Sequence, residues 1–509
     1  MRSEAIVFIG FMGAGKTSAL EAARAVGLAT TDADELLEDE LGMSVTDFFE
    51  REGEQAFRAR EAEIIGPRLE EMMSGAIALG GGSVLSERVR KALGRHTVVW
   101  LEIGTETAWG RVGESSRPLA QDPAAFKRLH AERTPLYESL ADVILPEGDR
   151  GQASQALPSI RALSDLPEGT KLLWAASASG EYPVFVGRGL LDSGWWPLGN
   201  RRFCITDSTV GALYADLIEP LAVRIEVEPG ESSKDIDEAV EILDQLAYTD
   251  MTRQDHVVAL GGGVVGDLAG FCAHIYQRGV PVVQVPTSLV AQVDSAYGGK
   301  TGVDTAGGKN YVGAYHLPAA VLADPTALAS LPSRELAAGF VEVIKTGLLA
   351  GGELWERVRS IEVLDPDELD ELVFACARYK CSIVAADERD SGVREVLNLG
   401  HTVGHAIEAE SGYTRYRHGE AIGLGLLAAL RLSEAPLLRD EVEAILARHG
   451  LPVVLESADV EILLAHLQRD KKRTAAGVGF VLLSEPGKPR TGQILDPDVV
   501  REAVLELYP

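Results

Sequence analysis

The feature that most restricts the fold of this chain is the stretch GFMGAGKT at residues 10–17, directly after the apolar run AIVFI at residues 5–9. It fits the pattern GxxxxGK followed by Ser or Thr, in which glycines let backbone N–H groups surround phosphates. In such a loop Lys16 carries the phosphate charge, and the hydroxyl of Thr17 reaches Mg²⁺. The pattern predicts a strand, a phosphate loop and a helix that bind ATP or GTP. The residues expected to contact the nucleotide are Gly13, Ala14, Gly15, Lys16, Thr17 and Ser18.

The length of 509 residues leaves room for about three compact domains of roughly 100 to 200 residues each. Up to about residue 146, strand-like runs alternate with charged helical segments, which is the pattern of a parallel α/β unit. Residues 146–171 contain few bulky apolar side chains and several Pro, Gly and Ser, so we place a domain boundary near residue 165. Strand-like runs return up to about residue 325, and the remainder is mainly helical, with a late hairpin between residues 478 and 495. The sequence thus predicts domains at residues 1–165, 166–325 and 326–509.

Composition limits the partners. Asp and Glu outnumber Lys and Arg by 77 to 48, which gives a formal net charge of −29. Nucleic acids and anionic membranes reward clustered cations, so we exclude both as main partners and expect small molecules instead. If the substrates are anions, local Arg and Lys side chains in the clefts must attract them.

The cellular compartment is indicated only indirectly. Cys204, Cys272, Cys376 and Cys381 show no CxxC spacing and suit a reducing compartment. The apolar N-terminal run lacks a basic lead-in and a cleavage site, and it continues into the phosphate loop. The longest later apolar run, at residues 421–430, is about half a membrane span. We therefore expect a cytoplasmic protein.

A phosphate loop alone does not identify the phosphate acceptor, so the residues that follow it matter. Carboxylates occur in TDAD, arginines occur in AFRARE, SRPL and ERTPLY, and a triple glycine follows a short apolar run. Arginine binds a carboxylate in bidentate fashion, an aspartate orients an attacking hydroxyl, and glycines let the backbone approach a small polyol. Taken singly, Arg58 could be a solvated helix residue and Arg133 could pair with Glu132. The candidate acceptor residues are Asp32, Asp34, Arg58, Gly80, Gly81, Gly82, Arg117 and Arg133.

Taken in this order up to about residue 146, the motifs closely resemble shikimate kinase. The resemblance implies ATP-dependent phosphorylation of the 3-hydroxyl of shikimate. It assigns shikimate binding to Asp34, Arg58, Gly80, Gly81, Gly82 and Arg133. It also places Asp32 near Mg²⁺ through water and Arg117 on a lid that touches the transferred phosphate, and it makes Lys16, Asp34 and Arg117 catalytic.

A second glycine-rich loop follows the strand-like run HVVAL in GGGVVGD, where Gly261, Gly263 and Gly266 satisfy GxGxxG. The acidic residue that normally ends the next strand of a Rossmann unit is missing, so a standard Rossmann unit is doubtful. An earlier acid, Asp207, could instead bind a ribose, and EPGESSK offers Glu231 and Lys234. We expect a dinucleotide to be bound here by backbone amides of the loop.

Histidines cluster further along the chain in LNLGHTVGHAIE and RHGEAIG. His401 and His405 are four residues apart and would share one face of a helix, and His418 begins another segment. With Glu342 in FVEVIKTG as a possible oxygen ligand, the cluster suits a catalytic Zn²⁺ with an open coordination position. The residues alone leave open which three of these four bind the metal. HExxH is absent, which disfavours a zincin protease.

Cations lie between and beside these segments: Arg278, Lys300, Lys309, Lys345, Lys380, Arg394 and the DKK run at residues 470–472, together with Asn310. So many cations beside glycines and a metal cluster, in an acidic protein, indicate a pocket for a phosphorylated carboxylate. For any single lysine, a solvated surface position is the alternative.

The run of motifs from GGGVVGD through QVPTSLVAQVDSAYGGKTGV, GFVEVIK, LNLGHTVGHAIE and HGEA to DKK resembles 3-dehydroquinate synthase, over about residues 170–509. The resemblance implies that Glu342, His401 and His418 bind Zn²⁺ or Co²⁺, and that His405 is a hydrogen-bonding or proton-transfer group and not a ligand. It assigns NAD⁺ binding to Asp207, Glu231, Lys234, Gly262, Gly263, Val264, Asp267, Thr287, Ser288, Asp294 and Lys309. It assigns substrate binding to Arg278, Lys300, Asn310, Lys345, Lys380, Arg394 and Asn398, and it makes Lys300, Lys345 and Arg394 catalytic. The family often has Thr at Ser288 and Ser-Val at Ala296-Tyr297, which affects fine geometry.

Together the two resemblances imply a bifunctional α/β protein: a P-loop kinase domain with a parallel sheet, then an α/β NAD-binding domain, then a mainly helical metal-binding domain. Its cofactors would be ATP, Mg²⁺, NAD⁺ and Zn²⁺ or Co²⁺. The second reaction would convert 3-deoxy-arabino-heptulosonate 7-phosphate to 3-dehydroquinate with phosphate release. A homodimer through the synthase part is expected.

Two alternatives remain at this stage. The C-terminal part could be a metal-dependent polyol dehydrogenase, which would accumulate NADH. The N-terminal part could be a regulatory or assembly module that binds nucleotide without turnover.

Overall fold

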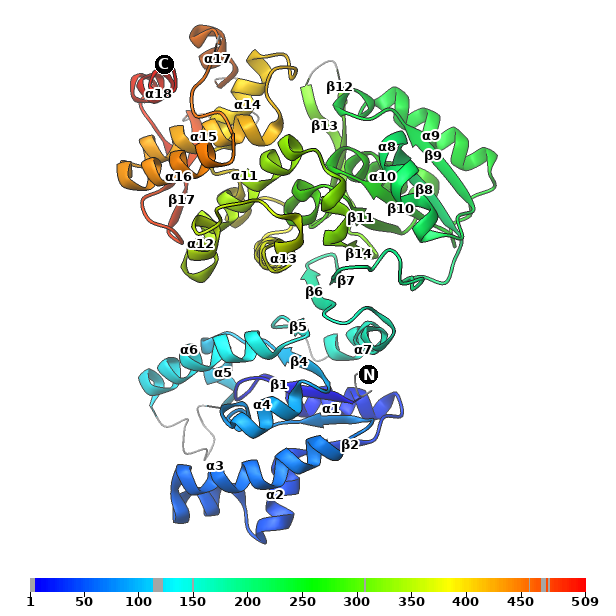
Figure 1. Ribbon diagram of the computed structural model, residues 1–509, viewed down its shortest axis with the longest axis vertical. Coiled ribbons are helices and arrows are strands. Elements are labelled where there is room, and N and C mark those ends of the chain that lie inside the picture. The colour runs from blue at the N-terminus through cyan, green and yellow to red at the C-terminus, as the bar shows by residue number, and fades with distance from the viewer. Residues whose placement is uncertain are drawn as a thin grey trace. The chain divides into compact units, whose positions relative to one another are not determined.

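The computed structural model describes residues 5–112, 122–148, 151–305, 308–456, 458–467, 473–474 and 477–509. The chain divides into two compact units, Met1–Ala176 with Pro183–Pro197, and Ser177–Tyr182 with Leu198–Pro509. In Figure 1 the first unit runs from blue to cyan, and the second is mostly green to red. A parallel α/β unit at the front, a second α/β region and a mainly helical end confirm the expected fold class.

The first unit is built on a parallel sheet. Its strands are β1 Ile6–Ile9, β2 Thr30–Asp32, β3 Ala76–Ala78, β4 Thr97–Leu101, β5 Val143–Leu145 and β6 Lys171–Ser177, in the order β2-β3-β1-β4-β5-β6. β1, β3 and β4 are buried along their whole lengths, which is typical of parallel strands with helices on both faces. β1 lies between β3 and β4. Open α/β sheets bind ligands at the carboxyl ends of the strands, at the point where the strand order reverses. The loop after β1 lies at such a point, because the strands on either side of β1 are β3 and β4.

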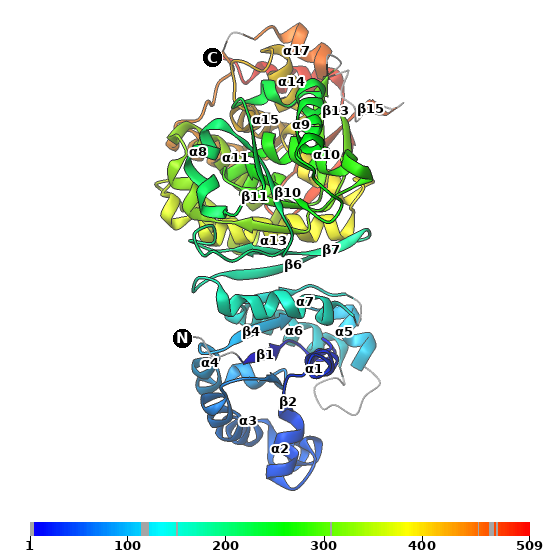
Figure 2. The ribbon, with the colours of Figure 1, turned by 90° about the vertical axis from the view of Figure 1, so that its right-hand side faces the viewer.

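The helices of the first unit are α1 Lys16–Ala25, α2 Ala33–Leu41, α3 Val45–Glu71, α4 Glu87–Leu93, α5 Thr105–Val112, α6 Pro123–Leu140 and α7 Gln152–Ala162. α3 is kinked at Gly53, and its later part packs beside α4 (Figure 2). α7 lies inside residues 146–171, the stretch that we interpret as a domain boundary. Its few apolar residues suffice for a helix because Ala156, Leu157 and Ile160 share one buried face.

The second unit begins with another parallel sheet. Its strands β8 Arg202–Asp207, β9 Val223–Val227, β10 His256–Gly261, β11 Val282–Pro286 and β14 Ala320–Ala323 pair in the order β14-β11-β10-β8-β9. The helices α8 Ser208–Tyr214, α9 Ile236–Tyr248 and α10 Gly263–Ile275 connect them. α10 packs on β10 and on the antiparallel hairpin of β12 Lys300–Thr305 and β13 Gly308–Tyr315. β7 Gly180–Val186 has residues in both units.

The rest of the second unit is mainly helical. It contains α11 Ser333–Ala350, α12 Gly352–Arg359, α13 Asp370–Ala386, α14 His401–Glu410, α15 His418–Leu432, α16 Pro436–Arg448, α17 Val460–Leu467 and α18 Pro497–Leu505. α15 is almost wholly buried and packs against α11 and α14. The late hairpin is present as β16 Gly477–Leu483 and β17 Pro489–Ile494, with the short β15 Arg473–Thr474 beside β16.

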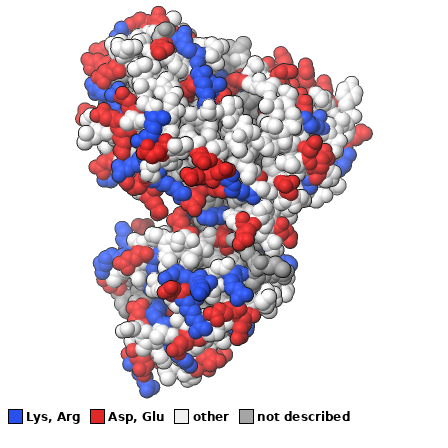
Figure 3. Space-filling view, in the orientation of Figure 1, with Lys and Arg blue, Asp and Glu red and all other residues white. Residues whose placement is uncertain are grey.

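The surface agrees with the composition. On the face drawn in Figure 3, Asp and Glu side chains are interspersed with Lys and Arg over both units. None of the helices within the described ranges combines the length and the hydropathy that a membrane crossing needs.

Candidate functional site

The first candidate site lies in the first unit, at the loop between β1 and α1. Gly13 and Gly15 adopt φ of 81° and 91°, which side chains rarely tolerate, and Gly15 caps α1 without any side-chain hydrogen bond. The first N–H groups of α1 are therefore open to a ligand, and a helix N-terminus favours phosphate. Lys16 Nζ donates to the carbonyls of Gly10 and Phe11 at 2.8 and 3.0 Å, which holds the ammonium across the loop. The loop thus has the geometry of a phosphate site.

A cavity of about 440 Å³ adjoins this loop. It is lined by the loop residues Gly13, Ala14, Gly15 and Ser18 and, from the far side, by Arg111, Glu147 and Gln152 among others. Arg111 Nη1 donates to the carbonyl of Gly13 at 2.9 Å, so this guanidinium borders both the loop and the cavity. The volume falls in the usual range of roughly 300–1,000 Å³ for small-molecule sites.

The expected acceptor residues converge on the triple glycine after β3. A Cβ added at Gly80 would lie 3.2 Å from Asp34 Oδ1, and one added at Gly82 would lie 2.2 Å from Arg58 Cζ. Arg133 is buried and its Nη1 donates to the carbonyl of Gly81 at 3.3 Å. Asp32 caps α2 by accepting the amide of Asp34 at 2.9 Å. Residues from α2, α3 and α6 therefore meet at one place, and at Gly82 a side chain would collide with the guanidinium of Arg58.

Glu61 is a residue of this site that sequence reasoning missed. Its side chain is buried and its two oxygens accept hydrogen bonds from Arg58 Nη1 and Ser83 Oγ, both at 2.6 Å. The solvated alternative for Arg58 is therefore wrong, because the guanidinium is held against the glycines. The i, i+3 spacing of Arg58 and Glu61 in AFRARE was the available signal. Arg117 lies outside the described residues.

The second candidate site lies at the carboxyl edge of the second sheet. The register pairs Thr206 with Leu260 and Gly261 with Pro286, so Asp207, which ends β8, lies at the same edge as Gly262 and Thr287, which follow β10 and β11. Gly262 caps α10 without a side-chain hydrogen bond, which leaves the first amides of that helix open to a phosphate. Asp207 caps α8 through the amides of Thr209 and Val210. The remaining loop residues named for the cofactor, Gly263, Val264 and Ser288, lie at the same edge.

Charged residues named for the cofactor pair with one another. Lys234 Nζ lies 2.9 Å from Glu231 Oε1 and 3.4 Å from Asp267 Oδ2, and Lys309 Nζ lies 3.2 Å from Glu231 Oε1. Burial raises the pKa of Asp267 to about 6, although Lys234 opposes this. Burial lowers the pKa of Lys234, but Asp267 and Glu231 outweigh it and raise that pKa above its ordinary value.

A candidate metal centre is formed by three helices. Glu342 comes from the middle of α11, and His401 and His418 are the first residues of α14 and α15. One ligand atom of each lies within 4.8 Å of the others, and Glu342 Oε1 lies 3.7 Å from His401 Nε2 and 3.5 Å from His418 Nε2. His401 Nδ1 lies 3.1 Å from the carbonyl of Leu399, which turns Nε2 towards Glu342.

The donor set fits a divalent metal. Glu342 is buried, and neither of its oxygens accepts a hydrogen bond of good geometry from the described residues, although Lys345 Nζ lies 2.5 Å from Oε2. A buried carboxylate beside two imidazoles, with Lys345 as its charge partner, is a ligand set that fits a catalytic Zn²⁺ with an open position. A second group of His405, Glu408 and His418 also lies within 4.8 Å, but its His405 is exposed.

Cations surround this centre on one side. Lys345 and Lys380 are buried, and Lys380 Nζ lies 2.7 Å from Asp294 Oδ1. Burial lowers the pKa of Lys380, with Asp294 opposing and the charges of Lys345 and Arg394 adding to the effect. Lys345 and Lys380 are each paired with a carboxylate, Glu342 and Asp294 respectively, and with Arg394 they supply three neighbouring cationic side chains for binding an anion.

The loop that carries Arg394 is held by a carboxylate. Asp387 accepts the amides of Ser391, Gly392 and Arg394 at 2.9, 2.7 and 3.1 Å. Arg394 Nη1 in turn donates to the carbonyl of Glu388 at 2.6 Å. Lys300 Nζ pairs with Asp390 Oδ2 at 2.5 Å in the same loop. Asn398 ends the 3₁₀ segment Val393–Asn398, just before His401.

Some named residues are not brought to the metal centre by any described contact. Arg278 is exposed in the turn Tyr276–Arg278. Asn310 lies on β13, and its backbone amide donates to Asp304 Oδ1.

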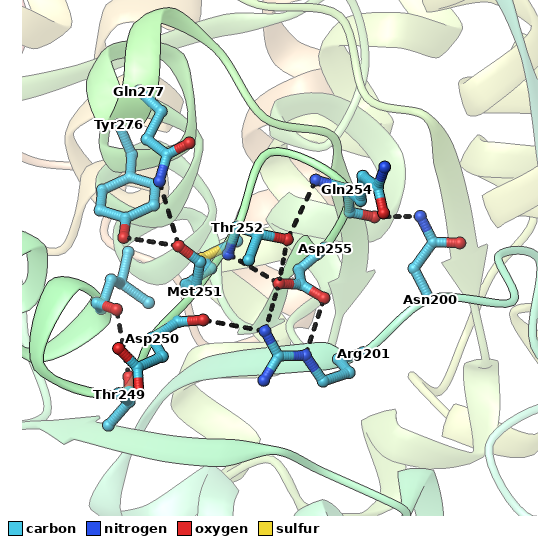
Figure 4. Close-up of polar contacts among 11 residues, drawn as sticks. Asn200, Arg201, Thr249, Asp250, Met251, Thr252, Gln254, Asp255, Tyr276 and Gln277 are labelled. Atoms are coloured by element: carbon cyan, nitrogen blue, oxygen red, sulfur yellow. Dashed lines mark hydrogen bonds and ion pairs between the residues drawn. The ribbon is translucent and has the colours of Figure 1, made fainter.

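The turn of Arg278 is held by Tyr276 Oη and Gln277 Nε2, which both donate to the carbonyl of Met251 (Figure 4). Beside it, Arg201 makes a bidentate pair with Asp255 at 2.9 and 2.7 Å (Figure 4). The DKK run at residues 470–472 lies outside the described residues.

Comparisons with known proteins divide the chain in the same way. Residues 12–163 match the family model of shikimate kinase, residues 224–338 that of 3-dehydroquinate synthase N-terminal, and residues 339–473 that of 3-dehydroquinate synthase C-terminal. The chain is 40% identical over 344 residues to a 3-dehydroquinate synthase of Symbiobacterium thermophilum, covering 63% of this chain and 96% of the relative. It is 42% identical over 354 residues to a 3-dehydroquinate synthase of Caulobacter vibrioides, covering 64% and 95%.

Among solved structures, the chain is similar to 2-deoxy-scyllo-inosose synthase in complex with carbaglucose-6-phosphate, NAD⁺ and Co²⁺. The identity is 26%, the TM-score is 0.60, and the likeness covers 66% of this chain and 99% of that chain.

Proposed function

We infer two reactions from the two sites, in a chain that belongs to the 3-dehydroquinate synthase family and carries a shikimate kinase domain in front of it. The chain is a bifunctional enzyme of the shikimate pathway. One reaction phosphorylates shikimate with ATP to give shikimate 3-phosphate. The other converts 3-deoxy-arabino-heptulosonate 7-phosphate to 3-dehydroquinate and releases phosphate.

We propose that the kinase reaction is carried by residues 1–165. Lys16 and the open amides of α1 bind the phosphates, Thr17 and Asp32 hold Mg²⁺, and Asp34 orients the 3-hydroxyl of shikimate. Arg58 and Arg133 bind the shikimate carboxylate beside the triple glycine, since guanidinium groups match a carboxylate in bidentate geometry. Arg117 is assigned to the transferred phosphate by family resemblance alone.

We propose that the synthase reaction is carried by residues 166–509. The observation that carries this proposal is the convergence of Glu342, His401 and His418 beside the buried Lys345, in the same unit as the glycine-rich loop before α10. These three residues would hold Zn²⁺ or Co²⁺, and NAD⁺ would lie on the amides of α10. The metal would supply Lewis acidity, and NAD⁺ a transient oxidation that is reversed within the turnover. The inosose synthase solved with NAD⁺ and Co²⁺ supports both cofactors.

The chain's own residues then have separate tasks. Lys345, Lys380, Arg394 and Lys300 bind the carboxylate and phosphate of the substrate and exclude water from them. His405, whose ring centroid lies 5.2 Å from that of His401, moves a proton next to the metal centre. Phosphate can leave only where its charge is held, which the buried cations provide.

Two assays separate this proposal from the alternatives. The synthase should release phosphate from its substrate without net NADH, whereas a polyol dehydrogenase would accumulate NADH in step with alcohol consumed. ADP release should depend on added shikimate, whereas a nucleotide-sensing module would show no such dependence. Net NADH, or ADP release that ignores shikimate, would contradict the corresponding half.

Assembly and location are further parts of the proposal. We propose a homodimer through the synthase part, to be tested by light scattering of the full chain against a chain lacking residues 1–165. A cytoplasmic location fits four cysteines that are all buried and free.

A further inference from the structure

A row of alternating charges crosses the second unit between the metal centre and the dinucleotide loop. It begins at a histidine of the metal centre and ends at a carboxylate on the first turns of α10. Its members, in order, are His418, Glu408, Lys309, Glu231, Lys234 and Asp267, and the successive contacts measure 3.3, 3.7, 3.2, 2.9 and 3.4 Å.

The first contact of the row orients a metal ligand. His418 Nε2 faces Glu342, and on the other side of the ring His418 Nδ1 lies 3.3 Å from Glu408 Oε2. The side chain of Glu408 is only 5% exposed, so water competes little for this oxygen. A histidine that binds metal through Nε2 must carry its proton on Nδ1, and a carboxylate that accepts this proton fixes both the tautomer and the ring plane.

Lys309 joins this carboxylate to the cofactor side. Its ammonium lies 3.7 Å from Glu408 Oε1 and 3.2 Å from Glu231 Oε1, and it sits 4.3 Å from the centre of the Tyr413 ring. Glu408 belongs to α14, whereas Glu231 opens the 3₁₀ segment Glu231–Ser233 after β9. One cation on the hairpin β12–β13 therefore contacts the helical part and the sheet part of the same unit.

We propose that Glu408 is a positioning residue for the metal ligand His418, and that Lys309 couples metal binding to NAD⁺ binding through Glu408 and Glu231. The proposal rests on the proposed synthase function for the identity of both ligands. Metal binding orders His418 and Glu408, and an ordered Glu408 holds Lys309 and, with it, Glu231 beside the dinucleotide loop. By linkage, NAD⁺ must then tighten metal binding by the same factor.

The test measures affinities in the full chain, with no turnover. Zn²⁺ affinity is obtained by competition with a chromophoric chelator, and NAD⁺ affinity by titration calorimetry with and without Zn²⁺. We expect Zn²⁺ to tighten NAD⁺ binding by about 5- to 150-fold in the unaltered chain. We expect Glu408→Gln to weaken Zn²⁺ binding about 10- to 100-fold, the usual effect of losing such a partner.

Matched variants serve as controls. Glu410→Gln makes the same change on the same helix, but its carboxylate accepts the amide of Asp459 and should leave Zn²⁺ affinity unchanged. Lys309→Met should bring the ratio of the NAD⁺ affinity with Zn²⁺ to the NAD⁺ affinity without Zn²⁺ close to one. Lys488→Met, which removes an exposed ion pair with Glu485, should leave this ratio as in the unaltered chain. Because both affinities are measured on the same variant, any direct contribution of Lys309 to NAD⁺ binding cancels in the ratio.

The outcomes separate the two levels of the argument. If the unaltered chain binds neither Zn²⁺ nor NAD⁺, the proposed synthase function fails. If it binds both but Glu408→Gln keeps full Zn²⁺ affinity, or if Lys309→Met keeps the full ratio, only the present inference is overturned. Far-ultraviolet circular dichroism of each metal-free variant checks that it is folded.

Discussion

Replacing Gly82 by Ala tests whether the triple glycine exists to make room for Arg58. Gly82 has φ −103° and ψ −7°, which alanine adopts without strain. The added Cβ would nevertheless lie 2.2 Å from Arg58 Cζ and 2.3 and 2.4 Å from its terminal nitrogens. These distances are far below van der Waals contact, so the guanidinium must move while the backbone can stay.

The size of the effect follows from the hydrogen bond that the Arg58 guanidinium loses when it moves. Its hydrogen bond to Glu61 at 2.6 Å is charge-assisted, and such bonds contribute about 1.5–3 kcal/mol. Restricting the unfolded chain by the change from Gly to Ala offsets about 0.4–1 kcal/mol of this loss. We expect a net destabilisation of about 0.5–2.6 kcal/mol. If Arg58 also binds the shikimate carboxylate, losing a contact of that size raises the KM for shikimate about tenfold to a hundredfold.

The assay is ADP release at varied shikimate, with the KM for ATP and the phosphate release of the synthase measured on the same preparation. Both should stay unchanged. Gly94→Ala is the matched control, because Gly94 has φ −60° and the nearest atom to its added Cβ lies 3.7 Å away. A Gly82→Ala enzyme with an unaltered KM for shikimate, or one no worse than Gly94→Ala, would refute the reasoning.

Three further predictions concern the separate centres and the stability of the second unit. His401→Ala should abolish 3-dehydroquinate formation and spare the kinase, and Lys16→Ala should do the reverse, because the two sites share no residue; loss of both activities in either variant would contradict this. Removing divalent metal with a chelator should stop phosphate release in the synthase assay, and Zn²⁺ or Co²⁺ should restore it; full activity after verified metal removal would contradict the proposed centre. Burial, and then the charge of Arg202, lowers the pKa of His256 from 6.5 to about 4. The unfolded chain therefore binds this proton at a higher pH than the folded chain does, so stability should fall as pH drops from about 6.5 towards 4, by about 2 kcal/mol between about pH 7 and pH 5. The free energy of unfolding of His256→Gln, measured with urea, should depend less on pH than that of the unaltered chain. The same pH dependence in both proteins would refute this prediction.

Much of the first site was readable from the chain because its parts are short contiguous motifs. The phosphate loop specifies its own geometry: Gly13 and Gly15 permit the positive φ that wraps amides around a phosphate, and Lys16 follows directly. The sequence also placed Asp34, Arg58 and Arg133 in the right order as candidates. It could not show that they meet, or that Glu61 clamps Arg58, because that contact depends on how α3 packs over the glycines after β3.

The second site depended more on tertiary structure. Spacing alone put His401 and His405 on one helical face and left the metal ligands open among four residues. The structure brings Glu342 to His401 and His418 by packing α11 and α14 against α15, and it leaves His405 exposed, with its ring centroid 5.2 Å from that of His401. Sequence separation says nothing about such distances, since helices far apart in the chain meet only where their apolar faces are buried together.

What the sequence determined by itself is therefore the local chemistry: two glycine-rich loops, a supply of cations in an acidic chain, and a cluster of histidines. Only the tertiary structure decided which charges face each other, as with Lys309 between Glu231 and Glu408. Backbone conformation in a loop is set by neighbouring residues, whereas the partner of a buried charge is set by the fold that excludes water from both.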